Sequence, residues 1–206
     1  MATSTINKRV LFRIYKNKRG WVFTPSDFID LGSLSAVRKT LERLTIKGTI
    51  RRIERGFYDF PELHNDFGIC SPGVDEFVMA FARQNKCRVI PWGGYAANVL
   101  GINPDVPAKC VYLTDRSCRK KILGRLDVIF RKTTPKNLAV TSEIGALVIQ
   151  GLKFMRKRHV NFKVIQHLRW RLDKKQKDQI LKDIPCAPAW IAKVIKKVVT
   201  VDWRAY

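Results

Sequence analysis

Residues 24–61 read TPSDFIDLGSLSAVRKTLERLTIKGTIRRIERGFYDFP, and this stretch decides the fold that we predict for the N-terminal part. Thr24 suits a helix N-cap, Pro25 the first helical position and Asp27 the first turn. We therefore expect a short helix that stops near Gly32.

A longer helix is predicted next, capped by Ser33 or Ser35 and running to about Lys47. Gly48 follows in the position where glycine commonly ends a helix. Apolar side chains recur along one face at the spacing of helical turns, which predicts a buried stripe. These positions are Val37, Leu41 and Leu44.

The opposite face of this helix is polar and suits the DNA major groove, which is wide enough to admit a helix. Arg38 and Lys39 can reach guanine acceptors or phosphates. The hydroxyls of Ser33 and Ser35, with the N–H groups of the helix N-terminus, suit a phosphate. The residues expected to point outward are Ser35, Ala36, Arg38, Lys39, Thr40, Glu42 and Arg43.

A hairpin is predicted after the helix, with strands at 49–53 and 57–60 around a turn at 54–56. Such a wing lies along the DNA backbone or enters the minor groove, where arginine is favoured. Arg51 and Arg52 are neighbours on a strand and point to opposite faces. We therefore expect only one of them, together with Arg55, to meet DNA.

A helix at 5–16 and an extended piece at 21–23 precede the quoted stretch. The resulting order is that of a winged helix-turn-helix, predicted as a DNA-binding domain over residues 1–61. The alternative is a winged helix used only for protein contacts, with an ordinary solvated basic face.

The charge of the chain favours an anionic partner. Its 206 residues include 40 basic and 17 acidic side chains, a net charge of +23. Nucleic acid is the leading candidate partner, and an anionic membrane surface is the second. The balance is +8 over residues 1–61, +4 over 62–150 and +11 over 151–206.

Residues 61–72, rich in proline and polar side chains, are predicted to be a linker. A basic α/β domain is expected over 73–206, with strands near 88–90, 110–114 and 126–131, and helices from Ser142 onward. The predicted fold class is therefore α+β, with an N-terminal winged helix and a mixed α/β C-terminal domain that ends in helices.

Basic side chains gather in two places of the second domain. A stretch from Lys153 to Lys177 holds ten basic residues and the single acid Asp173, which favours nucleic-acid contact over a merely solvated face. We select Arg156, Lys157, Arg158 and Lys163 as its C-terminal basic face. A second run is either a solvated loop or a phosphate-contact patch, and comprises Arg116, Arg119, Lys120, Lys121 and Arg125.

Catalytic and metal-binding patterns are not evident in the sequence. The five cysteines are scattered without a CxxC pair, and His64, His159 and His167 suit surface positions. No carboxylate pair or Ser/His/Asp order stands out, so we expect no enzyme, no metal and no cofactor. The N-terminus lacks a signal-peptide core and no apolar stretch approaches a membrane span, which predicts a cytoplasmic protein without a membrane partner.

Two parts of the sequence resemble the AbiEi-type antitoxins. The first is VFTPSDFIDLGSLSAVRKTLERLTIKGTIRRIERGFYDFP at 22–61, in particular its Arg55-Gly56-Phe57-Tyr58 turn. The second is PWGGYAANVLG at 91–101, followed by Val111-Tyr112-Leu113-Thr114. The resemblance covers roughly residues 1–135 and weakens in the last helices.

The resemblance implies the antitoxin of a type IV toxin–antitoxin system. In that family the N-terminal domain represses its own operon by binding inverted repeats in the promoter, so double-stranded DNA is the expected partner. The C-terminal domain counters a nucleotidyltransferase-like toxin, often without forming a stable complex with it. The alternative function is an RNA-binding accessory protein that uses the basic C-terminal helices.

Overall fold

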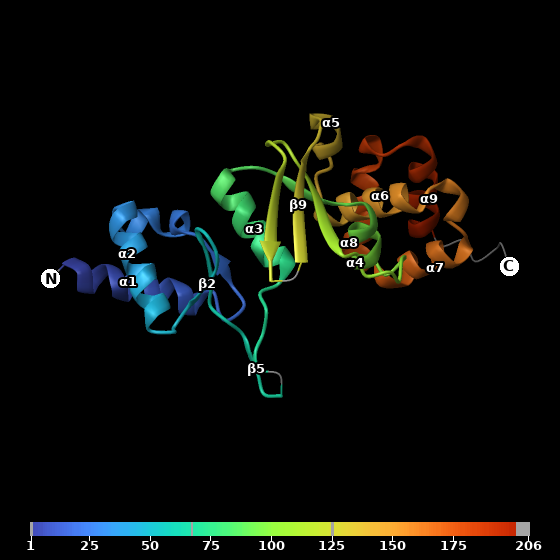
Figure 1. The fold of residues 1–206 in the computed structure, drawn as a ribbon. Helices are drawn as coiled ribbons and strands as arrows, with labels where there is room; N and C mark the ends of the chain where they lie inside the picture. The colour runs from blue at the N-terminus through green and yellow to red at the C-terminus, as the bar shows by residue number, and fades with distance from the viewer. Residues whose placement is uncertain (1, 67, 125, 201–206) are drawn as a thin grey trace. The chain divides into compact units, whose positions relative to one another are not determined.

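The computed structural model describes residues 2–66, 68–124 and 126–200, and the fold is a mixed α+β one (Figure 1). The chain divides into two compact units. The first comprises residues 1–87 with 122–126, and the second residues 88–121 with 127–206.

The first unit begins with two helices on either side of a short 3-10 helix, followed by a hairpin. Strands β1, β3 and β2 form an antiparallel sheet in that order, with Val22 opposite Asp59 and Arg51 on the other side of Asp59. The elements are α1 (Ala2–Lys16), β1 (Val22–Phe23), η1 (Pro25–Leu31), α2 (Leu34–Ile46), β2 (Arg51–Glu54) and β3 (Phe57–Asp59).

The core of the first unit follows the predicted apolar stripes. The stripe of α2 packs against α1, η1 and the sheet, and its three predicted members are buried. At the start of η1, the Asp27 carboxylate accepts hydrogen bonds from the backbone N–H and the hydroxyl of Thr24, as its position in the first turn predicts. The fully buried members are Val10, Ile14, Phe23, Phe28, Val37 and Leu41.

The region expected as a linker contains a small hairpin, β4 (Leu63–His64) with β5 (Gly68–Ile69). Its two-residue strands are too short to show a period in the sequence. The helix after it, α3 (Val74–Asn85), belongs to the first unit, whereas the sequence placed it in the second domain. Arg83 of α3 explains the grouping, because its guanidinium donates to the Val22 carbonyl and to Asp27.

A four-stranded sheet of order β6-β7-β9-β8 belongs to the second unit except for residues 122, 123 and 126, at the end of β8 and the start of β9. Strand β6 pairs antiparallel with β7, and β7 pairs parallel with β9, with Cys110 opposite Val128. The strands are β6 (Val89–Trp92), β7 (Lys109–Thr114), β8 (Arg119–Leu123) and β9 (Leu126–Lys132). Strand β8 was not predicted, because Arg119, Lys120 and Lys121 are consecutive basic residues, which are more typical of a solvated loop than of a strand.

Helices α6, α7, α8 and α9 follow the sheet in the second unit and pack on one another (Figure 1). Helices α4 and α6 pack so closely that a Cβ at Gly151 would lie 2.8 Å from a Leu100 methyl group. The helices are α4 (Gly93–Val99), α5 (Pro135–Leu138), α6 (Glu143–Met155), α7 (Phe162–Arg171), α8 (Lys174–Lys182) and α9 (Ala189–Val199), with 3-10 turns η2 (Lys157–His159) and η3 (Ile184–Cys186).

Candidate nucleic-acid interface

Helix α2 begins at its cap and ends at a left-handed glycine, as the sequence predicts. The Ser33 side chain accepts a hydrogen bond from the backbone N–H of Ala36, so Ser33 rather than Ser35 is the N-cap. Gly48 has a φ of +69°, a conformation that a side chain would strain. The two serine hydroxyls lie 3.2 Å apart and are exposed, so both stay accessible to a phosphate.

One groove of about 520 Å³ lies between α2 and the β2–β3 hairpin. It brings together three of the predicted arginines, Arg38 from α2 and Arg52 and Arg55 from the hairpin, and all three are exposed. The other lining residues are Pro25, Ser26, Leu34, Glu42, Thr45, Ile46, Gly56, Tyr58 and Gln84.

Lys39 and Arg43 lie outside this groove. They line a smaller hollow of about 370 Å³ together with Glu42 and Ile46, which border both hollows. Lys39 and Arg43 are exposed, as predicted, and one Arg43 nitrogen donates to the Thr40 hydroxyl at 3.3 Å. The predicted residues of α2 therefore present two adjoining cationic surfaces.

The expectation that Thr40 points outward is wrong. Its side chain is fully buried, and its hydroxyl donates to the Ala36 carbonyl at 2.9 Å. Thr40 follows Val37 by three positions and precedes Leu44 by four, so the helical period itself places it in the buried stripe. A hydrogen bond to the previous turn satisfies the hydroxyl there.

The structure selects Arg52 over Arg51 as the strand arginine that faces the groove. Arg51 turns to the buried Asp59, with Nη2–Oδ2 and Nε–Oδ1 distances of 2.5 and 3.1 Å, and also donates to the Cys70 carbonyl. The hydrogen bond that Arg51 donates to Asp59 outweighs the cost of burial and raises the pKa of Arg51. Arg51 is therefore paired with Asp59 within the first unit, and Arg52 is the one of the two strand arginines that lines the groove.

Three polar residues of the groove were not predicted, and they come from elements outside α2 and β2. Ser26 lies in η1, Tyr58 in β3 and Gln84 near the end of α3. Tyr58 lies directly opposite Arg52 in the sheet, and that cross-strand pairing could have been found from the predicted hairpin register. Gln84 carries no local signal, because it joins the groove only through the packing of α3.

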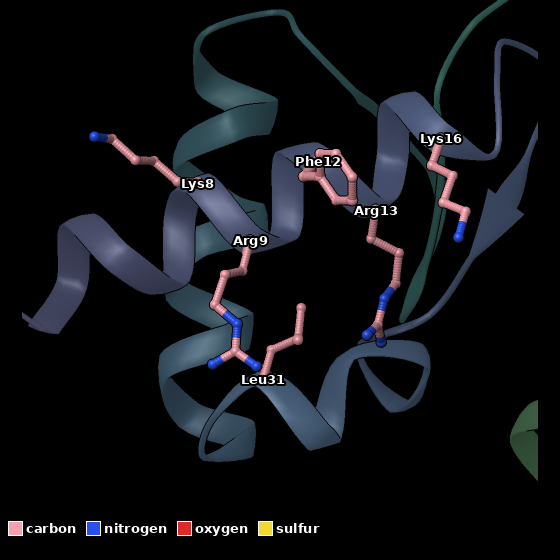
Figure 2. A pocket seen from close by; sticks show the side chains of 6 residues that line it. All are labelled: Lys8, Arg9, Phe12, Arg13, Lys16 and Leu31. Atoms are coloured by element: carbon pink, nitrogen blue, oxygen red, sulfur yellow. The ribbon is translucent and has the colours of Figure 1, made fainter.

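A second large hollow, of about 490 Å³, lies on the outer side of α1 and reaches η1 (Figure 2). Its lining includes Lys8, Arg9 and Lys16 around an exposed Phe12, and it shares no residue with the groove. Arg13, also in the lining, forms a two-fold hydrogen bond with Asp30 at 2.6 Å. That contact lowers the pKa of Asp30 to about 2.

The C-terminal basic face lies around the end of α6 and the start of α7. Arg156 caps α6 with a positive φ of 61°, Lys157 and Arg158 form η2, and Lys163 lies in the first turn of α7. All four side chains are exposed. In the other basic run, Lys120 forms an ion pair with Asp127 at 3.0 Å, and Arg125 lies outside the described residues.

Over residues 2–66, 68–124 and 126–200, no three His, Cys, Asp or Glu side chains gather in a way that could hold a metal ion. Among the helices of those same ranges, none has the length and apolar character needed to cross a bilayer.

The chain was compared with known families, curated proteins and solved structures. Residues 9–180 match a family described as a family of unknown function, DUF6088. No curated protein matches. A crystal structure of the RV2827C protein from Mycobacterium tuberculosis is similar at 14% identity and a TM-score of 0.41, covering 95% of this chain and 76% of that one.

Proposed function

The chain belongs to the DUF6088 family, whose function is unknown, and we propose that it is a DNA-binding autorepressor whose first unit acts as a winged helix-turn-helix. The observation that carries this proposal is the convergence of Arg38, Arg52 and Arg55 on one groove. Helix α2 and the β2–β3 hairpin are the two elements that a winged helix applies to duplex DNA.

In this proposal the groove residues divide into base and backbone contacts. Helix α2 enters the major groove, where Arg38 donates to the O6 and N7 atoms of guanine and Glu42 accepts from the N4 amine of cytosine. The hairpin places Arg52 and Arg55 on phosphates or in the minor groove. Ser33, Ser35, Lys39 and Arg43 add phosphate contacts along the exposed side of α2.

The antitoxin role rests on the resemblance to AbiEi-type antitoxins. We infer that the second unit counters a nucleotidyltransferase-like toxin in the cytoplasm, without a stable complex, and that Arg156, Lys157, Arg158 and Lys163 carry this activity. Their exposure and uniform charge support it. Charge reversal of these four residues should abolish protection of cells that express the toxin and leave DNA binding intact.

The DNA-binding proposal is tested with the DNA upstream of the protein's own gene. Fluorescence anisotropy with that duplex and a random duplex should give tighter binding to the upstream DNA. Arg38→Ala should cost roughly 1–3 kcal/mol on the upstream duplex and much less on the random one. Arg52→Ala and Arg55→Ala should weaken both duplexes alike and reduce the salt slope by about one each.

Lys8→Ala and Arg9→Ala are the matched controls, because they remove the same charge from the hollow on α1 (Figure 2). They should change affinity far less than the groove variants. Equal losses from the α1 and groove variants would show that net charge, and not the groove, determines binding. An unchanged preference in Arg38→Ala would remove α2 from the role of recognition helix.

A further inference from the structure

Exposed aromatic side chains stand among cations along α6 and α7 in the second unit. Trp170 is 84% exposed, and Phe154 and Phe162 are 47% and 46% exposed. Large apolar side chains that gather on a charged surface mark interaction sites more often than single exposed ones do. The order along the chain is aromatic, basic, aromatic, basic and aromatic: Phe154, then Arg156 to Arg158, Phe162, Lys163 and Trp170.

Basic residues far outnumber acidic ones along this part of the sequence. Between Lys153 and Lys177 the chain has ten basic residues and one acid, Asp173, whose carboxylate accepts the backbone N–H of Gln176. Arg169 and Arg171 donate to backbone carbonyls of Lys197 and Val99. A neutral carbonyl orients a guanidinium without cancelling its charge, so the field of the cluster persists.

The packing of α6 against the start of α4 holds the ring of Phe154 in place. Phe154 lies across the backbone of the Gly93-Gly94 pair, where a Cβ on Gly94 would be 3.3 Å from its ring. The residue before this pair, Trp92, is 38% exposed. The guanidinium of Arg131 lies over its ring, 5.2 Å from the ring centroid. An aromatic ring beside a stacked guanidinium is a surface on which planar groups stack.

On α7, Lys163 and Trp170 are seven residues apart and therefore share one face of the helix. Gln166 lies between them, and all three are exposed. This face places a cation, an amide and an indole in one row, which are groups that can contact a phosphate, a base edge and a base plane.

We propose that Trp92, Arg131, Phe154, Arg156, Lys163 and Trp170, the aromatic–basic surface, bind single-stranded nucleic acid. Only unpaired bases offer their faces to aromatic rings, whereas a duplex hides them in its stack. The cations contact the phosphates and the rings stack on bases, so binding tolerates many sequences. This activity is separate from duplex recognition by the first unit and does not depend on it, although it shares Arg156 and Lys163 with the C-terminal basic face.

The test uses the full chain with a fluorescein-labelled oligouridylate and an oligothymidylate of equal length. Trp170→Ala should lower affinity for single strands by about five- to one-hundred-fold and leave the salt slope unchanged, because stacking releases no counterions. Lys163→Ala should lower the slope by about 0.7. Trp170→Phe should recover most of the affinity, since a phenyl ring still stacks.

Phe12→Ala is the matched control, because it removes an exposed aromatic ring among cations in the other unit. It should leave single-strand affinity unchanged, and Trp170→Ala should leave affinity for the upstream duplex unchanged. Preference for oligouridylate identifies RNA as the natural ligand, and equal binding identifies single strands of either kind.

Two results would overturn the proposal. One is single-strand affinity that stays at the wild-type value in both Trp170→Ala and Phe154→Ala, with circular dichroism showing that both variants are folded. The other is Trp170-dependent binding of polyglutamate with no binding of either oligonucleotide, which would assign the surface to an acidic protein.

Discussion

Asp59 in the first unit and Asp183 in the second are both 1% exposed, yet they are held by opposite kinds of partner. Asp59 faces the guanidinium of Arg51. Asp183 accepts hydrogen bonds from the backbone N–H groups and the hydroxyls of Thr141 and Ser142. One buried carboxylate is therefore balanced by a cation, and the other by neutral donors.

The difference determines how many cations each unit keeps for its surface. In the first unit, Arg51 belongs to the hairpin but forms an ion pair with Asp59. Counting the basic residues of the hairpin therefore gives more cations than line the groove. In the second unit, the donors to Asp183 within residues 126–200 are the backbone N–H groups and hydroxyls of Thr141 and Ser142, which are neutral. The kind of partner that a buried acid has therefore affects how many basic side chains remain unpaired at the surface.

The largest effect expected from this comparison comes from Arg51→Ala. It leaves the Asp59 carboxylate buried without its counter-ion, which should lower the free energy of unfolding of the first unit by about 3–5 kcal/mol. Urea unfolding measures the loss. Arg52→Ala, one residue on, should stay within about 0.5 kcal/mol of the wild type because its side chain is exposed. Equal stabilities for the two variants would contradict the assignment of Arg51 as the structural arginine.

Asp183→Ala should have the next largest effect, about 2–3 kcal/mol, because the N–H groups of Thr141 and Ser142 lose their acceptor. Asp178→Ala is the control, since Asp178 lies in α8, which Asp183 caps, and is exposed. Urea unfolding should separate the two variants. If they coincide, the contact with Asp183 does not stabilise the second unit.

The same carboxylate makes stability depend on pH. Burial raises the pKa of Asp183, but hydrogen bonds from Ser142 and Thr141 outweigh it and bring the pKa below its ordinary value. Its contribution is therefore complete above the unfolded-state pKa of about 3.9 and is lost as pH falls through the lower folded-state pKa. The second unit of Asp183→Asn should show a flatter acid dependence of its free energy of unfolding than the wild type.

The smallest effect is expected at the exposed pair of Arg13 and Asp30, where solvent screens both charges. The hydrogen bond from Arg13 holds the pKa of Asp30 at about 2, and NMR titration of the carboxyl carbon should find it there. Asp30→Asn should change the urea midpoint less than either buried-acid variant. A loss as large as that of Asp183→Ala would show that exposure does not set the order of these effects.

The sequence by itself determined the elements that local patterns encode. The cap at Ser33, the apolar stripe of α2 and the left-handed Gly48 fixed that helix to within two residues. Charge and spacing also named Arg38, Arg52 and Arg55, which meet in one groove. These features were predictable because caps and helical periods involve residues only three or four positions apart.

Only the tertiary structure showed which basic side chains remain exposed at the surface and that α3 belongs to the first unit. Asp27 lies 56 residues from Arg83, so no local pattern reports that pairing. The hairpin register places Arg51 opposite Asp59, but the burial of Asp59 depends on tertiary packing. The exposure of Trp170 has the same origin, because an apolar residue in a helix is buried or exposed according to what packs on it. Contacts between residues far apart in the sequence determine which charged side chains are paired in the interior and which remain at the surface. Local sequence patterns do not contain this information.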